Sequence, residues 1–165
     1  MPVETIDGQQ VNVGLVPMSE AATMSGLALM QAICVGDQPG PSIGAAMNFR
    51  MLEVKEGEVT FAGTPHDGVM NPIGTVHGGW ASTILDSALA CCVHTLCPVG
   101  YASTSIDLKV NFVRPILPTT GRLFAKGTVV HPGRQIATSQ ASLMDAEGKL
   151  YAHGTQACSI FKIPV

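Results

Sequence analysis

The sequence contains few charged residues. Asp, Glu, Lys and Arg make up 13% of its 165 residues, whereas 46% are hydrophobic. Nine basic residues stand against twelve acidic ones and the formal net charge is −3, so there is no basic field to attract nucleic acid or an anionic membrane. We therefore expect no nucleic-acid partner and no membrane partner. Such a composition often accompanies a large subunit interface, although a monomer is also compatible with it.

Long apolar runs, a leader pattern and metal-binding spacings are also missing. No apolar run approaches the ~20 residues of a membrane-spanning helix. The first ten residues place no basic region before an apolar stretch, so we expect no signal peptide. The cysteines and histidines follow no ligand spacing, and we predict no metal. Three cysteines crowd one apolar segment, where reduced cysteines are common, which favours a cytoplasmic location. The cysteines are Cys34, Cys91, Cys92, Cys97 and Cys158, and the histidines in question are His94, His131 and His153.

A glycine-rich loop followed by an apolar helix dominates the sequence between Asn71 and Leu96. The apolar residues cover most of the helix circumference, which is typical of a buried helix. One acid, Asp86, lies among them, and the helix carries no lysine or arginine to neutralise it. Buried carboxylates are rare unless they are paired, hydrogen-bonded or used in function. Asp86 is therefore the first functional candidate, with a structural acid bonded to Ser82 or Thr83 as the alternative.

The residues before the loop predict one helix and two strands. Residues 1–18 are polar and mixed, so we expect them to be extended or poorly ordered. A helical pattern from 19 to 34 ends in a loop rich in Gly and Pro. Two strands joined by a tight turn are expected at 43–55 and 59–63. No repeat, low-complexity tract or linker interrupts the chain.

The residues after the helix follow a period of two. From Ser105 to Phe112 the even positions are apolar, as in a half-buried antiparallel strand. Three more strands are spaced as hairpins, at about 121–131, 134–144 and 149–162. We predict a four-strand meander. Because the helix is apolar all round, the simplest arrangement is an α+β fold with an antiparallel sheet packed on it.

The loop at Gly78 and Gly79 enters the start of the helix, where backbone amides lack intrahelical acceptors. Glycine lets a ligand approach the backbone closely, so these amides suit a carbonyl oxygen that becomes an oxyanion. Packing is an equally good reason for the glycines. Asp86 lies eight residues beyond Gly78, about 12 Å along one helix, which is too far to serve one reacting centre. A second, antiparallel copy would bring them together, which argues for a two-fold dimer with composite sites.

Three features of the sequence closely resemble those of a known family. They are the spacing N-x-x-G-x-x-H-G-G from Asn71 to Gly79, an acid nine residues past His77, and the run F-V-R-P at 112–115. The family is that of the hotdog-fold acyl-CoA thioesterases of the phenylacetic-acid-degradation and 4-hydroxybenzoyl-CoA thioesterase type. The resemblance spans about residues 43–162. It implies an antiparallel sheet wrapped around one long central helix, in a hotdog domain at 43–165. Residues 1–42 would be an N-terminal extension with a short helix.

The resemblance also implies residue roles. The Gly78 amide, helped by Asn71, would polarise the thioester carbonyl, and His77 would shape the loop and assist at the sulfur or carbonyl. Asp86 of the partner subunit would act as general base or as nucleophile. The enzyme would be a homodimer with composite sites, often paired again into a dimer of dimers, with acyl-CoA as substrate and no cofactor. From the residues alone, His77 fits a structural loop histidine equally well, and Asn71 before Pro72 fits a turn.

Five further positions are candidates, Ser105 for orienting water and Gly79, Thr104, Arg114 and Arg134 for binding substrate. Ser105 occupies the position of a hydroxyl that orients water in some relatives, although strict alternation turns Ser105 outwards and Thr104 inwards. Gly79 allows close approach of substrate. Arg114 and Arg134 suit the phosphates of coenzyme A, or are ordinary solvated charges.

Other functions have weaker support. A hotdog dehydratase would need an H-x-F-P-G-x-P loop, which is absent. A non-catalytic acyl-CoA sensor would lack the acid and would usually carry a basic DNA-binding segment, and a plain interaction protein would not explain Asp86. Cys91 and Cys92 have no adjacent base to make them nucleophiles. We predict hydrolysis of an aryl- or medium-chain acyl-CoA to free acid and CoA, with a non-catalytic acyl-CoA-binding or other hotdog protein as the alternative.

Overall fold

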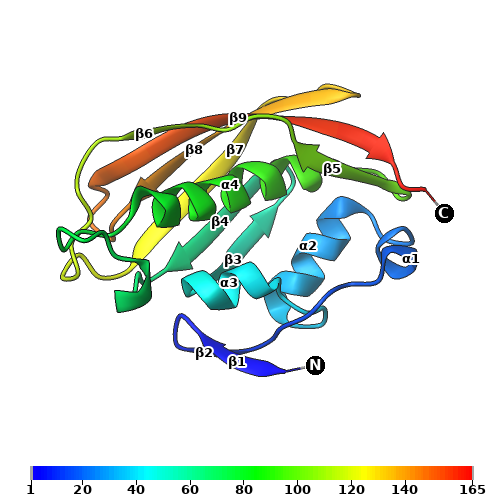
Figure 1. The fold of residues 1–165 in the computed structure, drawn as a ribbon. Coiled ribbons are helices and arrows are strands. Elements are labelled where there is room, and N and C mark those ends of the chain that lie inside the picture. Colours follow the sequence, from blue (N-terminus) through cyan, green and yellow to red (C-terminus); the bar gives the residue numbers. More distant parts are fainter. Residues whose placement is uncertain (1, 165) are drawn as a thin grey trace.

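A curled antiparallel sheet wraps around one long helix in the computed structural model, which describes residues 2–164 (Figure 1). The helix, α4, runs from Gly78 to His94. The main sheet has seven strands in the order β3-β4-β7-β8-β9-β5, with β6 also pairing with β9. The predicted α+β hotdog fold is confirmed. The strands are β3 Phe49–Lys55, β4 Glu58–Gly63, β5 Tyr101–Ser105, β6 Lys109–Phe112, β7 Leu123–His131, β8 Ile136–Met144 and β9 Leu150–Lys162.

The predicted four-strand meander is wrong in one respect. Strands β7, β8 and β9 follow one another as neighbours, and β4 lies on the other side of β7. Strands β5 and β6 instead pair with β9 at the far edge. The chain reaches that edge through α4, which crosses the concave face of the sheet between β4 and β5 (Figure 1). The helix therefore separates β3 and β4 from the later strands in sequence, and in space it packs on the face of the sheet that all these strands form together.

One side of α4 packs on the sheet, and the other side is only half-buried. Eight of its residues are buried: Trp80, Ala81, Ile84, Leu85, Ala88, Leu89, Cys92 and Val93. At Gly127 of β7 a Cβ would lie 2.3 Å from the Ala88 carbonyl oxygen, so only glycine permits this close approach. The prediction of a buried helix is therefore confirmed for one side only, because Ser82, Thr83 and Asp86 lie on the half-buried side.

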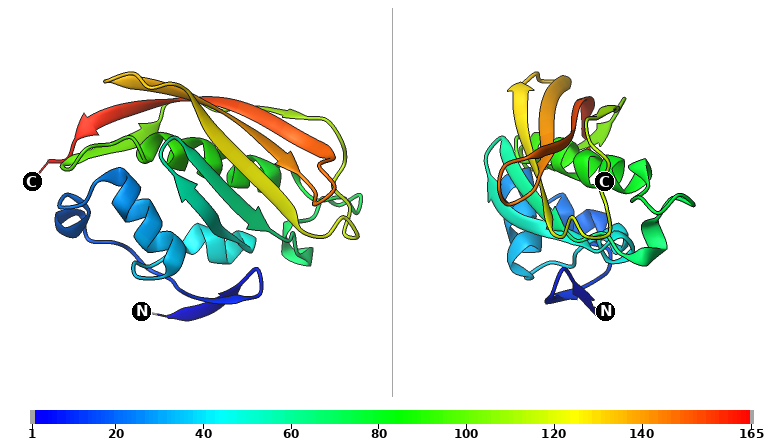
Figure 2. Two further views of the ribbon diagram at one scale, coloured as in Figure 1. Left: turned by 180° about the vertical axis from the view of Figure 1, so that it is seen from behind. Right: turned by 90° about the vertical axis from the view of Figure 1, so that its left-hand side faces the viewer.

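The N-terminal residues form a hairpin, which bears out the extended alternative for residues 1–18. Its strands are β1 Val3–Ile6 and β2 Gln9–Asn12, and it lies below the short helices and away from the main sheet (Figure 2). The predicted helix at 19–34 is divided into α1 Met18–Ala21 and α2 Gly26–Val35. Ser25 caps the start of α2 by accepting from the Ala28 amide. Gly26 packs so closely on the His94 carbonyl that a Cβ would lie 1.8 Å from its oxygen.

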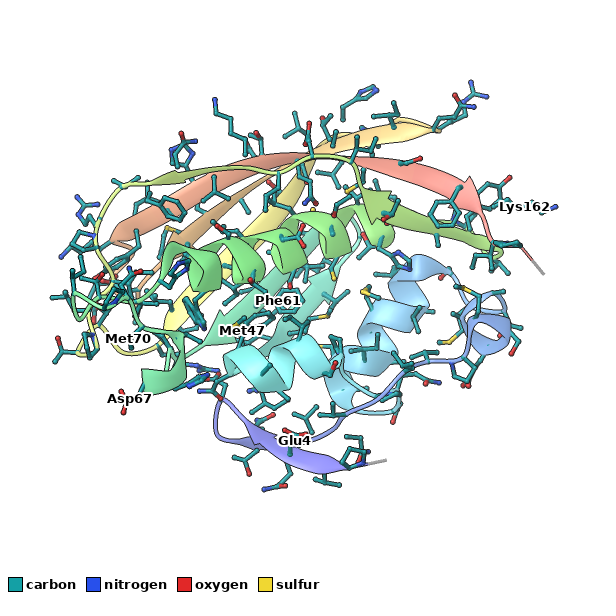
Figure 3. The ribbon with its side chains drawn as sticks, viewed as in Figure 1. Glu4, Met47, Phe61, Asp67, Met70 and Lys162 are labelled. Atoms are coloured by element: carbon teal, nitrogen blue, oxygen red, sulfur yellow. The ribbon has the colours of Figure 1, made fainter. Side chains whose placement is uncertain are left out.

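A third short helix replaces the start of the strand predicted at 43–55. Helix α3 runs from Ser42 to Met47, across the predicted boundary between extension and domain. Asn48 ends it in a left-handed conformation with φ of 53°, and β3 begins at Phe49. Side chains from the sheet and from α3, among them Phe61 and Met47, fill the space between α4 and α3 (Figure 3). No helix among residues 2–164 is long and apolar enough to cross a bilayer.

Candidate active site

The loop before α4 leaves one helix-start amide unoccupied. His77 is the N-cap, and its Nδ1 accepts the Gly79 amide at 2.8 Å. The Gly78 amide has no hydrogen-bond partner among the described residues. It belongs to the first residue of the helix, so it is a free donor at the positive end of the helix dipole. A carbonyl oxygen can therefore bind at Gly78, whereas the Gly79 amide is already used by His77.

Asn71 holds this loop in shape. Its Nδ2 donates to Thr75 Oγ1 at 3.1 Å and to the Val76 carbonyl at 3.4 Å. Its own carbonyl accepts the Gly74 amide at 3.0 Å, where Gly74 has φ of +83°. Asn71 and Gly78 also line one cavity together. Asn71 therefore combines the turn role with a place at the predicted carbonyl site.

A cavity of about 440 Å³ opens in front of the Gly78 amide. Its walls come from the loop before α4, from the end of β6 and from the start of β9. The ring of Phe112 lies against Gly78, because a Cβ there would come within 3.0 Å of it. Arg114 lines the same cavity and donates from Nη1 to the Leu150 carbonyl at 2.5 Å. Tyr151 of β9 also lines this cavity.

Asp86 lies further along α4, half-buried, with its two oxygens in different situations. Oδ1 accepts hydrogen bonds from Ser105 Oγ at 3.2 Å and from Gln156 Nε2. Oδ2 has no hydrogen bond and the carboxylate no ion pair among the described residues. One oxygen is thus held in place by the protein while the other stays free for water.

The alternative in which Ser82 or Thr83 holds Asp86 is wrong. Ser82 Oγ donates to the Gly78 carbonyl at 2.9 Å, and Thr83 Oγ1 donates to the Gly79 carbonyl at 2.7 Å. Both hydroxyls therefore satisfy carbonyl oxygens one turn back along the helix. The acid is held from the sheet instead.

Ser105 faces the helix, contrary to the strict alternation expected from 105 to 112. The predicted strand is interrupted between β5 and β6. Ser105 pairs with Cys158 and Lys109 with Thr155, so four steps along one strand match three along β9. This extra residue is a bulge that shifts the phase of the side chains by one. Asp107 completes the irregular stretch, since its carboxylate accepts the Ala157 amide at 2.8 Å.

Gln156 is the site residue that the sequence did not suggest. It is 2% exposed, and its Oε1 accepts from Cys158 Sγ at 3.4 Å while Nε2 donates to Asp86. A signal was present in β9. Ala152, Gly154, Gln156 and Cys158 share the inward phase, and Gln156 is the one polar amide among them. A lone amide in the core phase of a strand needs a buried partner.

The remaining predicted binding residues do not come together. Ser103 and Ser105 both direct hydroxyls to α4, the first to His94 Nδ1 at 3.2 Å, so Thr104 between them points to the opposite face. Arg114 lies beside the start of β9, at Leu150. Arg134 precedes β8, whose first residue pairs with Ser159 near the other end of β9. The two arginines are thus separated by about nine residues of strand, roughly 30 Å.

The site in one chain is therefore divided into two halves. The Gly78 amide, His77, Asn71 and Arg114 line one cavity, and Asp86 and Ser105 are absent from its walls. The two groups that must meet, the Gly78 amide and Asp86, belong to the same helix and lie about 12 Å apart along its axis. A single chain cannot bring both to one carbonyl carbon.

The cysteines around α4 are protonated thiols. Burial raises the pKa of Cys91 to about 12, with the Cys92 and Asp86 charges adding to the effect. Burial also raises the pKa of Cys92 to about 12, and burial lowers the pKa of His94. Among residues 2–164 no three His, Cys, Asp or Glu side chains are grouped as a metal site.

Most of the site lies in a region that matches a known family, with Asn71 and Gln156 just outside that region. Residues 73–152 match the thioesterase superfamily. Over 97 residues the chain is 32% identical to a protein of Halobacterium salinarum whose name suggests an esterase, a match that covers 54% of this chain and 62% of that protein. The chain spans about three fifths of the length of the curated relatives it matches.

Solved structures agree on the fold. A thioesterase family protein from Silicibacter pomeroyi is 25% identical with a TM-score of 0.67, covering 76% of this chain and 91% of that one. A phenylacetic acid degradation-related protein from Ralstonia eutropha JMP134 is 24% identical with a TM-score of 0.72, covering 79% of this chain and 98% of that one. The predicted resemblance to the hotdog thioesterases is confirmed.

We expect iodoacetamide at pH 8 to label Cys34 first and to leave Cys91 and Cys92 unmodified. The thiolate is the reactive form, and with a pKa of about 12 roughly one thiol in ten thousand is ionised at pH 8. Because the pKa is raised, any labelling should increase about tenfold per pH unit up to pH 12. Peptide mass mapping measures the extent of labelling at each cysteine. The unfolded chain is the control, in which all five cysteines react. Rapid labelling of Cys91 in the folded protein would contradict the burial argument.

Proposed function

We propose that this protein, a hotdog-fold relative of the thioesterase superfamily, is a thioester hydrolase that acts on acyl-coenzyme A. The observation that carries the proposal is the pairing of a free helix-start amide at Gly78 with a carboxylate, Asp86, of which one oxygen is held and the other is free. An oxyanion donor and a base are the two groups that acyl transfer to water requires.

The chemistry follows from the positions of these groups. The thioester carbonyl oxygen accepts the Gly78 amide, and Asp86 Oδ2 takes a proton from a water that adds to the carbonyl carbon. The negative charge that develops on the oxygen is stabilised at the helix start. When the carbon–sulfur bond breaks, the proton passes to the thiolate, and free acid and CoA leave. In the second route open to the same geometry, Asp86 Oδ2 attacks the carbonyl carbon directly and the CoA thiolate leaves. Water then hydrolyses the resulting mixed anhydride to the free acid and restores the Asp86 carboxylate.

His77 acts mainly on the shape of the loop. Its Nδ1 is engaged with the Gly79 amide, so it presents Gly78 rather than Gly79 to the substrate. Asn71 supports the same loop through Thr75 and Val76. Ser105 and Gln156 orient Asp86, and Ser105 is exposed enough to contact the attacking water as well.

For the substrate we propose an aryl- or medium-chain acyl group on coenzyme A. Apolar groups (Phe112, Ile116 and Ala81) line the cavity beside Gly78, and Arg114 at its edge suits a phosphate of coenzyme A. The phenylacetic acid degradation-related protein of similar fold favours an aryl group. Thr104 and Arg134 lie away from this cavity, and a contact from either requires a second chain.

A homodimer with composite sites is the smallest active unit in this proposal. The support is the separation of about 12 Å between the two half-sites on one helix. An antiparallel copy would place Asp86 of each chain opposite Gly78 of the other. Apolar side chains exposed near the β5–β6 edge offer surface for such contact, namely Ile106, Leu108, Phe112 and Val113. Further pairing into a dimer of dimers would be compatible with this arrangement.

The alternative is a non-catalytic acyl-CoA-binding protein. It would use the Gly78 cavity but would have no need for a carboxylate held by two hydrogen bonds with one oxygen free. A cytoplasmic location also belongs to the proposal. The five cysteines, all free thiols in the structure, agree with a reducing compartment.

The Asp86→Asn substitution should lower hydrolysis of acyl-CoA roughly a hundredfold or more, the scale of losing a general base. The amide can still accept from Ser105 and Gln156, so the fold should be unchanged. Release of free thiol from a panel of aryl- and medium-chain acyl-CoA thioesters measures the effect. Asp107→Asn is the matched control, because an amide oxygen there can still accept the Ala157 amide. Equal turnover by wild-type and Asp86→Asn protein would exclude this role for Asp86.

Gln156→Leu should lower kcat about tenfold and leave KM within about twofold of the wild-type value. The side chain orients Asp86 and lies behind it, away from the substrate, so the loss falls on the chemical step. Steady-state kinetics separate the two constants, and thermal unfolding reports any loss of stability. Gln140→Leu is a control on β8, where the side chain is exposed. A raised KM with unchanged kcat would show that Gln156 serves substrate binding instead.

Two inactive variants should rescue each other when their subunits exchange. Asp86→Ala removes the base, and Gly78→Val fills the space where Phe112 already lies 3.0 Å from a Cβ. Each heterodimer would contain one site with both defects and one with neither. Half of randomly re-associated dimers are heterodimers, so about a quarter of wild-type activity should return.

The control for this experiment is each variant unfolded and refolded alone. Native mass spectrometry of one isotopically labelled variant verifies that subunits have exchanged. If exchange is complete and no activity returns, the proposal of a site shared between two chains is wrong, and the Gly78 loop and Asp86 act separately.

A further inference from the structure

A second and larger cavity, of about 600 Å³, lies on the other side of α4. Its floor comes from β3, β4 and α4, through Phe49, Met51, Phe61, Ser87 and Cys91. Its roof and sides come from the N-terminal hairpin, α2 and the loop after it. It shares no lining residue with the cavity at Gly78. Its volume lies within the range of about 300–1,000 Å³ that small-molecule sites occupy.

Arg50 is the one charged side chain among the described residues that line this cavity. The other walls are mostly apolar, and no Asp or Glu belongs to them. None of the ion pairs among residues 2–164 includes Arg50. A guanidinium in such surroundings is costly unless an anion or several acceptors meet it.

The hydrogen bonds of Arg50 do not meet that need. Nη1 donates to the neighbouring Met51 carbonyl at 3.3 Å, a long contact. Nε is buried and has no partner, the sole buried side-chain nitrogen or oxygen among the described residues in that condition. An orphaned buried donor in a native structure calls for an explanation, and an absent ligand is one.

The N-terminal extension is fastened over this cavity by polar contacts outside it. Asp7, in the turn between β1 and β2, accepts from Arg122 Nε at 2.8 Å and Nη2 at 2.5 Å, and from Thr64 Oγ1 at 3.2 Å. Its amide donates to Asn48 Oδ1 at 2.7 Å. The hairpin is therefore fastened to residues that flank β3, β4 and β7, and the cavity lies beneath it.

We propose that this cavity is a binding site for a free carboxylic acid with an apolar body, in which the carboxylate meets the guanidinium of Arg50. A carboxylate matches the planar fork of an arginine and can accept from Nε and Nη2 together. An alkyl or aryl body suits the Phe, Met, Ile and Val side chains around it. Binding at this second cavity is a function additional to the proposed hydrolysis, and the proposal does not depend on that hydrolysis.

Equilibrium dialysis of octanoate against the wild-type protein should give saturable binding of one molecule per chain in this cavity. Octan-1-ol has the same chain without the charge and should bind at least tenfold more weakly. Arg50→Met should weaken octanoate binding at least tenfold and leave octanol binding unchanged. Lys55→Met is the matched control on the same strand. Lys55 is outside the cavity, so its replacement should change the affinity for neither octanoate nor octanol.

Alkylation of Cys34 locates the bound molecule. Cys34 lines the cavity, so saturating octanoate should slow its labelling at least tenfold in wild-type protein and not in Arg50→Met protein. Thermal unfolding verifies that the variant is folded. Two results would overturn the proposal: equal affinity for octanoate and octanol in the wild-type protein, or octanoate binding that leaves Cys34 labelling unchanged. The first comparison needs no variant, so it decides the question even if Arg50→Met does not fold.

Discussion

The length of α4 between Gly78 and Asp86 is the constraint on which the proposed active site depends. The helix cannot bend to bring the two groups together, because β7 lies directly against it at Gly127 and its inner side is buried in the sheet. The same packing leaves the opposite side half-buried, and the acid lies on that side. A site that is incomplete in one chain thus follows from the way the fold is built.

The sheet determines how the carboxylate is presented. Gln156 reaches Asp86 from β9, and Ser105 reaches it from β5, beside the bulge that separates β5 from β6. Without the extra residue in that bulge, the side chains of either β5 or β6 would point to the other face. With it, Ser105 and Val110 both face inwards, and Val110 packs against the core. The bulge between β5 and β6 therefore allows β5 to contribute Ser105 to the site and β6 to contribute Val110 to the core.

Patterns that repeat along the chain were predictable, and features that depend on one contact were not. The apolar run of α4 and the hairpin spacing of the segments that form β7, β8 and β9 indicated these elements within a few residues, and the loop motif indicated the Gly78 site. The break before α2 comes from the contact of Gly26 with the His94 carbonyl, far away in sequence. Helix α3 replaced the start of the strand predicted at 43–55. Over so short a stretch, its apolar residues fit both the strand period of two and the helix period of about 3.6. Gln156 was missed because its partner lies seventy residues away.

Asp86 and Arg50 each have hydrogen-bonding capacity that the protein leaves unused, and we interpret the two cases differently. Asp86 is half-buried and has two donors on one oxygen, so its free oxygen can face water at little cost. Arg50 has one long hydrogen bond and a buried orphan nitrogen, in a cavity without carboxylates. Water can serve the first group, whereas an anion with an apolar body serves the second and fills the space around it. The extension at residues 1–42 supplies most of the walls of that space, so the role that we propose for this segment is separate from the thioester chemistry that we propose for α4.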